Sequence, residues 1–270
     1  MNGERNLDQM HHDYDRDGVI MVRDFLNQNQ LSTLMDSLEY AVTNPGPMAS
    51  DLVASDSGNF FFDFLTFRRN PHIKSLCFDL ELLRKLSKIV GTNEIRMFHD
   101  NVLIKSGDAP ATPWHQDRPH YLVDGPKNFS VWMSPDDVSE NESLAFIPES
   151  HKCGKIFHSR SFKDGEEISE NNNFVSLTSE DFDLLTAKGI RVYHVRPGDA
   201  IVFDNRMLHS ALRGREPANR RALSLRFIGD GAHLTTNFAD PTPPLHRMGM
   251  KMIDGGTPNE IWFPIVFNNQ

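Results

Sequence analysis

The sequence predicts an α+β fold whose large β part forms a sandwich or a barrel. Apolar residues recur at helical spacing in the first third of the chain. After Gly91 the pattern changes to alternation, and several short apolar runs follow, separated by turns. Helices first and strands afterwards are typical of α+β chains. A TIM barrel is excluded, because it requires strands and helices to alternate along the chain.

Two helices are predicted before residue 93. In the first, apolar residues over 31–42 fall on one helix face, and Asn44-Pro45-Gly46-Pro47 ends the segment. The second begins after Asp79, a favourable N-cap, and ends at Gly91, a favourable residue after a helix.

The strands follow. Residues 95–105 alternate, with His99, Asn101, Leu103 and Lys105 on one face. Further strands are predicted at 129–133, 144–147, 190–195, 200–203 and 221–228. The predicted organisation is a single domain spanning residues 1–270. It has helical support over about 1–93, a β-barrel core over about 94–230 and a C-terminal extension over 231–270.

Composition and net charge exclude several classes of function. The formal net charge of the 270 residues is −9 and the chain holds two cysteines. An acidic chain does not favour a nucleic-acid groove, which depends on Lys and Arg contacts to phosphates. We also expect no cysteine-rich zinc site, no membrane span and no secretory signal, and therefore a cytoplasmic protein. The oligomeric state is left open.

Two His-x-Asp sequences occur, which is close to chance for this composition. His11-His12-Asp13 lies in a polar segment, where solvated residues are the simpler interpretation. His115-Gln116-Asp117 lies between strands in the β half. With the distant His209, it has the composition of the two-histidine, one-carboxylate triad of non-haem Fe(II) oxygenases.

Arg220 follows His209 by eleven residues on the last long predicted strand. Arginine binds a carboxylate through two charge-assisted hydrogen bonds, which suits a dicarboxylate cosubstrate. If Arg220 points inward, strand parity also places Ser224 and Arg226 inward. The opposite face then carries apolar side chains that the helices would cover: Leu223, Leu225 and Phe227.

The chain resembles the phytanoyl-CoA dioxygenase family of Fe(II)- and 2-oxoglutarate-dependent oxygenases over roughly residues 12–265. The resemblance rests on an ordered set of motifs. They are Phe98-His99-Asp100-Asn101 with Lys105, Thr112-Pro113-Trp114-His115-Gln116-Asp117, Asp136-Asp137-Val138, Phe146-Ile147-Pro148-Glu149-Ser150-His151, Pro197-Gly198-Asp199, His209, Arg220 and Arg226-Phe227-Ile228-Gly229-Asp230. The resemblance implies a double-stranded β-helix, a cupin-like jelly-roll barrel supported by the N-terminal helices.

The resemblance also implies the site. Iron would be bound by His115, Asp117 and His209, and 2-oxoglutarate by Arg220, with Trp132 and Asn101 beside it. O2 would be the second cosubstrate, and the products would be an oxidised small molecule, succinate and CO2. Hydroxylation is the expected oxidation, and desaturation stays open. Expected substrate contacts are His99, Arg118, Tyr121 and Arg226. The run Phe60-Phe61-Phe62 fits either substrate contact or plain packing, and packing is the simpler interpretation.

The sequence departs from the family pattern at Ala211, where some members place a serine that helps to hold 2-oxoglutarate. Two other functions stay open. One is a cupin-like metalloprotein that performs no oxygenation, although Arg220 has no purpose in that chemistry. The other is an inactive relative that binds a small molecule, although all three candidate ligands are present. No motif marks a CoA site.

Overall fold

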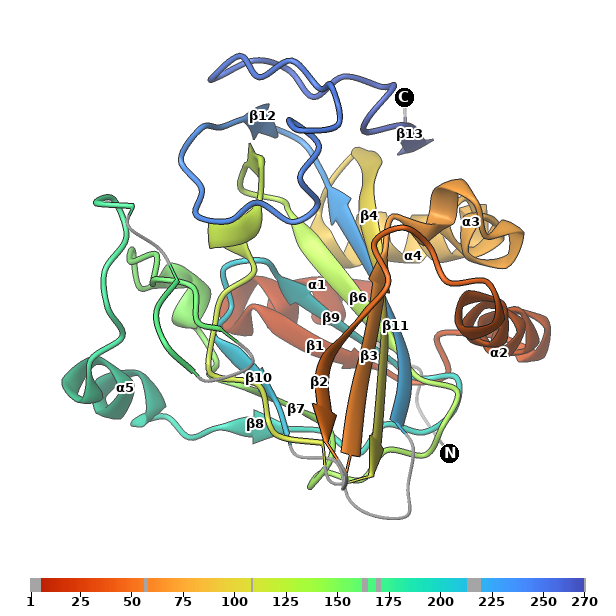
Figure 1. The fold of residues 1–270 in the computed structure, drawn as a ribbon, viewed down its shortest axis with the longest axis horizontal. Helices are drawn as coiled ribbons and strands as arrows, with labels where there is room; N and C mark the ends of the chain where they lie inside the picture. The colour runs from red at the N-terminus through yellow and green to blue at the C-terminus, as the bar shows by residue number, and fades with distance from the viewer. Residues whose placement is uncertain are drawn as a thin grey trace.

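The computed structural model describes residues 6–55, 58–107, 109–161, 165–168, 171–212 and 220–269. Its strands form a mainly antiparallel array with helices packed on one side (Figure 1). The large sheet has the strand order β1-β9-β6-β11-β4-β3-β2, and β13 pairs with β4. Its strands are β1 (Val19–Val22), β2 (Ser50–Ser55), β3 (Gly58–Phe64), β4 (Glu94–Gly107), β6 (Phe129–Met133), β9 (Ala200–Asp204), β11 (Arg220–Ile228) and β13 (Ile265–Asn268).

Two small sheets complete the β part. One has the order β10-β7-β8, and the other pairs β12 with β5. Their strands are β5 (Val123–Asp124), β7 (Leu144–Phe146), β8 (Arg191–Val192), β10 (His209–Ala211) and β12 (His233–Leu234). The expected barrel is therefore not closed: among the described residues β1 and β2 remain separate edges of the large sheet.

The helices lie behind and to the right of the large sheet in Figure 1, except for α5 on the left. They are α1 (Leu7–Asp17), α2 (Gln28–Thr43), α3 (Pro71–Cys77), α4 (Leu80–Val90) and α5 (Ser179–Thr186), with 3-10 turns η1 (Thr66–Arg68), η2 (Arg118–His120) and η3 (Ser150–Lys152). No helix in the described ranges has the length and apolar character needed to cross a bilayer.

The expectation that residues 1–93 are helical support is incomplete. The two predicted helices are present as α2 and α4, but β1, β2 and β3 in the same region join the large sheet. The segment around His11 is also helical, as part of α1. Its helical pattern is weak in the sequence because Tyr14 and Asp17 are the only fully buried residues in it.

The main core lies between the large sheet and the helices. From β11 it takes Leu223, Leu225 and Phe227, and from the helices residues such as Leu34 and Leu83. Burying these side chains removes apolar surface from water and stabilises the fold. The parity predicted for β11 is confirmed, and it leaves Arg220, Ser224 and Arg226 on the opposite face.

Asp79 caps α4 as predicted. Its carboxylate accepts hydrogen bonds from the backbone N–H groups of Glu81 and Leu82 and from the Gln30 side chain on α2. We expect Asp79→Ala to lower the free energy of unfolding by about 1–2 kcal/mol, because both cap bonds and the link to α2 are lost. Denaturant unfolding measures this. The exposed α2 residue Asp36 is the control, and Asp36→Ala should change stability by less than about 0.5 kcal/mol.

Candidate metal centre and cavity

Two backbone hydrogen bonds place the candidate histidines side by side. The His115 N–H donates to the His209 carbonyl oxygen at 3.0 Å, and the His209 N–H donates back to His115 at 2.9 Å. The imidazole centroids are 4.2 Å apart. His209 begins β10, which pairs with β7, so the loop that carries His115 is held against the small sheet. Residues 94 positions apart in the chain are thereby joined.

The second ring nitrogen of each histidine sets its tautomer. His115 Nδ1 lies 2.8 Å from the Pro113 carbonyl oxygen, and His209 Nδ1 lies 3.0 Å from that of Met207. A carbonyl oxygen only accepts, so each Nδ1 carries the proton and each Nε2 keeps the lone pair that a metal requires. Burial, assisted by the nearby His209, lowers the pKa of His115 to about 3, and burial also lowers the pKa of His209. Both rings are therefore neutral near pH 7.

Asp117 is buried and is held in its charged form. Burial by itself raises the pKa of this carboxyl, but the Arg226 charge and the two histidines outweigh burial and leave the pKa far below its usual value. Arg226 donates from Nη2 to Oδ1 at 3.0 Å and from Nε to Oδ2 at 3.2 Å. Tyr121 and Ser130 also donate to Oδ2, each at 3.3 Å.

These three side chains fit a divalent metal. Their candidate ligand atoms all lie within 4.8 Å of one another, and all three residues are buried. Two neutral imidazoles and one carboxylate are the donor set of non-haem Fe(II) sites, which leave other coordination positions for small ligands.

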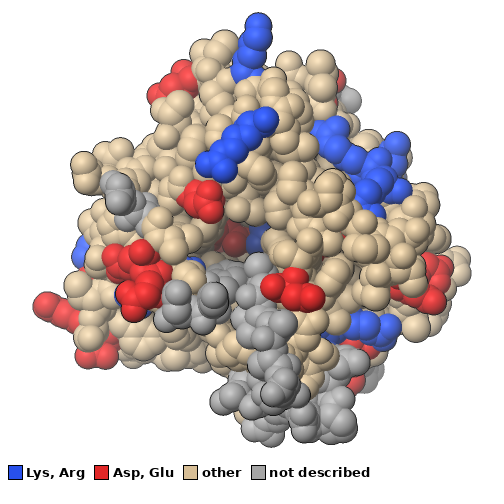
Figure 2. All heavy atoms as spheres, in the orientation of Figure 1, with Lys and Arg blue, Asp and Glu red and all other residues tan. Residues whose placement is uncertain are grey.

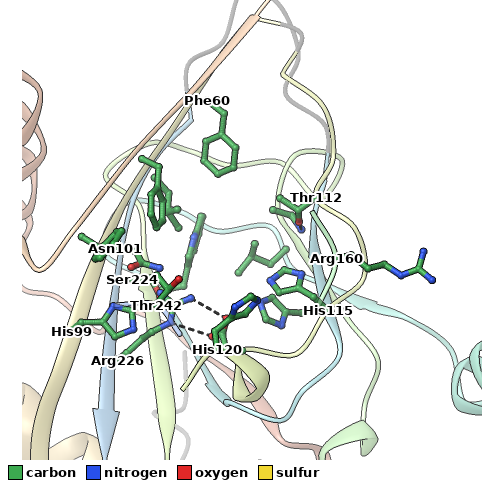
Figure 3. A pocket seen from close by; sticks show the side chains of 18 of the residues that line it. Phe60, His99, Asn101, Thr112, His115, His120, Arg160, Ser224, Arg226 and Thr242 are labelled. Carbon is green, nitrogen blue, oxygen red and sulfur yellow. Dashed lines mark hydrogen bonds and ion pairs between the residues drawn. The ribbon is translucent and has the colours of Figure 1, made fainter. Parts of the chain in front are cut away.

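The three residues line a cavity of about 380 Å³. In Figure 3, His99, Asn101, Ser224 and Arg226 stand on one wall, and Thr112, His115 and Arg160 stand on the other. The first wall belongs to the inner face of β4 and β11 in the large sheet. Figure 2 shows a hollow near the centre of this face of the molecule, with Asp and Glu side chains around it.

Most of the predicted site residues meet in this cavity. Its lining includes the three candidate metal ligands and six of the remaining predicted residues: Arg220, Trp132, Asn101, His99, Tyr121 and Arg226. The Asn101 amide links two of them when its oxygen is turned toward Arg226. In that orientation the oxygen accepts from Arg226, and the nitrogen donates to His99 Nδ1 at 3.1 Å.

Arg118 is the predicted site residue that does not line the cavity, so the structure does not support the contact with substrate expected for it. Its side chain is 2% exposed and does not line the cavity. The guanidinium instead donates to the Asn237 carbonyl oxygen at 3.0 Å and to Asp124 at 2.7 Å. The 3-10 turn η2, which begins at Arg118, places this side chain against Asn237 and Asp124.

The phenylalanine residues of β3 form part of the cavity wall. Phe60, Phe62 and Phe64 alternate on β3 and line the cavity, whereas Phe61 packs against the main core. Packing is confirmed for Phe61, and contact of Phe60 and Phe62 with a substrate stays a prediction. The alternation along 60–64 is the signal that predicts a wall facing the cavity, once these residues are recognised as a strand. Ser130 was missed as a partner of Asp117.

Comparison with known proteins identifies the family. The family model for phytanoyl-CoA dioxygenase (PhyH) matches residues 14–222. A 115-residue segment is 31% identical to phytanoyl-CoA dioxygenase 1 of Oryza sativa subsp. japonica. That segment covers 42% of this chain and only 37% of the rice protein.

Solved structures show the same fold. SnoN, a non-heme alpha ketoglutarate dependent epimerase from nogalamycin biosynthesis, aligns with a TM-score of 0.72 at 16% identity, over 96% of this chain and 98% of that one. SnoN has also been solved with Fe3+, alpha ketoglutarate and nogalamycin RO. EctD from S. alaskensis, solved with 2-oxoglutarate and 5-hydroxyectoine, aligns with a TM-score of 0.68 at 19% identity, over 95% and 86% of the two chains. The match of the family model across most of the chain shows that this protein belongs to the phytanoyl-CoA dioxygenase (PhyH) family.

Proposed function

We propose that this chain is an Fe(II)- and 2-oxoglutarate-dependent dioxygenase that hydroxylates a small organic molecule and releases succinate and CO2. One observation carries the proposal. Two neutral imidazoles and one charged carboxylate, with ligand atoms within 4.8 Å of one another, share a cavity with the buried Arg220. Membership of the PhyH family supports the same reaction class.

Each group has a role in this proposal. His115, Asp117 and His209 bind iron, and the iron supplies the oxidising chemistry when 2-oxoglutarate and O2 are present. Arg220 binds the distal carboxylate of 2-oxoglutarate, because a guanidinium forms charge-assisted bonds with carboxylates. Trp132 and Asn101 form the wall beside it. His99, Tyr121 and Arg226 lie on the substrate side.

The protein's own contribution is to orient the reactants and to exclude water. Phe60, Phe62 and Phe64 give the cavity an apolar wall, which favours a substrate with apolar surface. We place the whole reaction in one catalytic unit spanning residues 1–270. Cys77 and Cys153 are free thiols, which supports a reducing cytoplasmic location.

The test is turnover of 2-oxoglutarate. We expect succinate to form only when Fe(II), 2-oxoglutarate and O2 are all supplied, with slow uncoupled turnover in the absence of substrate. Stoichiometric zinc that iron cannot replace, together with no succinate, would contradict the proposal and favour the cupin-like alternative. Once a substrate is found by screening, labelled O2 should place one oxygen atom in the product. Epimerisation without oxygen incorporation would retain the cofactors but reject hydroxylation.

A further inference from the structure

A buried lysine stands opposite Arg220. The register of β4 and β11 pairs Lys105 directly with Arg220, and the two side chains are on the same face of the sheet. The residues are 1% and 7% exposed. Lysine and arginine are almost never buried to this degree unless a negative group compensates them.

The partners of both cations are neutral. Lys105 Nζ donates to the Pro110 carbonyl oxygen at 2.5 Å, and the carbonyl oxygens of Ala211 and Leu212 lie 3.4 Å away. Arg220 donates to the Glu142 carbonyl oxygen. Among the described residues neither cation forms an ion pair, and the Glu142 charge, which acts on Arg220, raises its pKa by less than burial lowers it. Carbonyl oxygens satisfy the N–H donors, but they do not neutralise the two charges.

The pKa values of both Lys105 and Arg220 are lowered in this environment. Burial, and secondly the charge of Arg220, lowers the pKa of Lys105 to about 7. Burial lowers the pKa of Arg220 to about 10. Each cation is thus less stable in this place than in water, and an anion bound between or in front of them would relieve that cost.

The position of the pair indicates where the anion binds. Arg220 and Ala211 line the cavity that holds the candidate metal ligands, whereas Lys105 lies behind them and 5.1 Å from the Phe60 ring centroid. Ala211 offers a methyl group to this end of the cavity and no hydroxyl donor. The positive charge at this end of the cavity therefore comes from Arg220, which lines the cavity, and from Lys105, which lies behind Arg220.

We propose that Lys105 is a positioning residue of the 2-oxoglutarate subsite, adding a second positive charge behind Arg220 and so selecting a ligand with a distal carboxylate. The inference rests on the proposed function. Lys105 acts in two ways, through its field and through the carbonyl oxygens of Ala211 and Leu212, which it holds beside the cavity. If Lys105 were only a structural clip, meaning a side chain that holds these two carbonyl oxygens in place, its charge would have no effect on the bound ligand.

The relative affinity of the protein for two 2-oxo acids distinguishes the effect of the Lys105 charge from its effect on the two carbonyl oxygens. Protein loaded with Mn(II) under anaerobic conditions is titrated with 2-oxoglutarate and with pyruvate, which has no distal carboxylate. We expect Lys105→Met to weaken 2-oxoglutarate binding by about tenfold or more, because a nearby charge in a poorly solvated site is lost. The affinity for pyruvate should be unchanged. Lys105→Arg should restore most of the preference.

Two further variants serve as controls. Lys105→Gln keeps a donor for the carbonyl oxygens without the charge, so it should lose the selectivity as Lys105→Met does, even if the methionine variant folds poorly. Lys127 is the matched lysine, because its ammonium also donates to a backbone carbonyl oxygen, that of Val90, far from the cavity lining. Lys127→Met should bind both acids as the wild type does.

The contrary results are distinct. Equal weakening of 2-oxoglutarate and pyruvate in both Lys105 variants would make Lys105 a structural clip and overturn the inference. Unchanged 2-oxoglutarate affinity in Lys105→Gln would overturn it as well. A wild type that binds neither acid when loaded with metal would instead reject the proposed function.

Discussion

We expect the replacement of Asp117 with alanine to abolish the proposed Fe(II)-dependent conversion of 2-oxoglutarate to succinate. Asp117 is the one carboxylate in the candidate metal centre, and two histidines alone hold Fe(II) weakly. We expect activity to fall below detection even with excess Fe(II). Succinate formation and bound iron per chain are the measurements.

Folding of this variant needs its own check, because Asp117→Ala leaves the Arg226 charge buried without its carboxylate. His115→Ala is the second variant, since it removes a ligand and keeps the Asp117–Arg226 pair; it should be equally inactive. Asp13→Ala, from the other His-x-Asp sequence, is the matched control and should retain full activity. Full turnover in both Asp117→Ala and His115→Ala would reject the assignment of the metal centre.

We expect Arg226→Met to destabilise the metal-free protein strongly, and we expect added metal to reverse much of the loss. The guanidinium makes two bonds to the buried Asp117 carboxylate, and its removal leaves an unpaired charge in the interior. Breaking such a pair costs about 3–5 kcal/mol. A divalent cation at the candidate centre supplies positive charge to the same carboxylate. The free energy of unfolding should therefore rise more on metal addition in Arg226→Met than in the wild type.

Arg118→Met separates this effect from ordinary loss of a buried arginine. Arg118 is also buried and pairs with Asp124, but it does not line the cavity. We expect Arg118→Met to be destabilised without any additional gain from metal. Equal gains in the two variants, measured by denaturant unfolding with and without Mn(II), would contradict a charge-compensating role for Arg226 at Asp117.

Local rules predicted much of this molecule. Alternation along β4 and β11 correctly placed Asn101 and Arg226 on the inner face and Leu225 on the face that the helices cover. The cap at Asp79 followed from its side-chain chemistry. Such features depend on neighbours within a few residues, so one sequence contains the information needed.

Other features depend on distant pairings. The backbone bridge between His115 and His209 joins a loop to the start of β10, and no local pattern connects the two. The edges of the large sheet stay apart because of how β1 and β2 pair, which short apolar runs do not reveal. Arg118 follows Asp117 directly in sequence, yet the turn at η2 sends its side chain to Asp124. The opposition of Lys105 and Arg220 likewise required the strand register.

Anaerobic titration of the metal-free protein with Fe(II) and 2-oxoglutarate tests the central claim most directly. Bidentate binding of a 2-oxo acid to Fe(II) gives a visible charge-transfer band. We expect this band to saturate at one Fe(II) per chain in the wild type and in Asp13→Ala, and to be absent in His115→Ala and Asp117→Ala. A wild type that takes up Fe(II) without any band on addition of 2-oxoglutarate would contradict it.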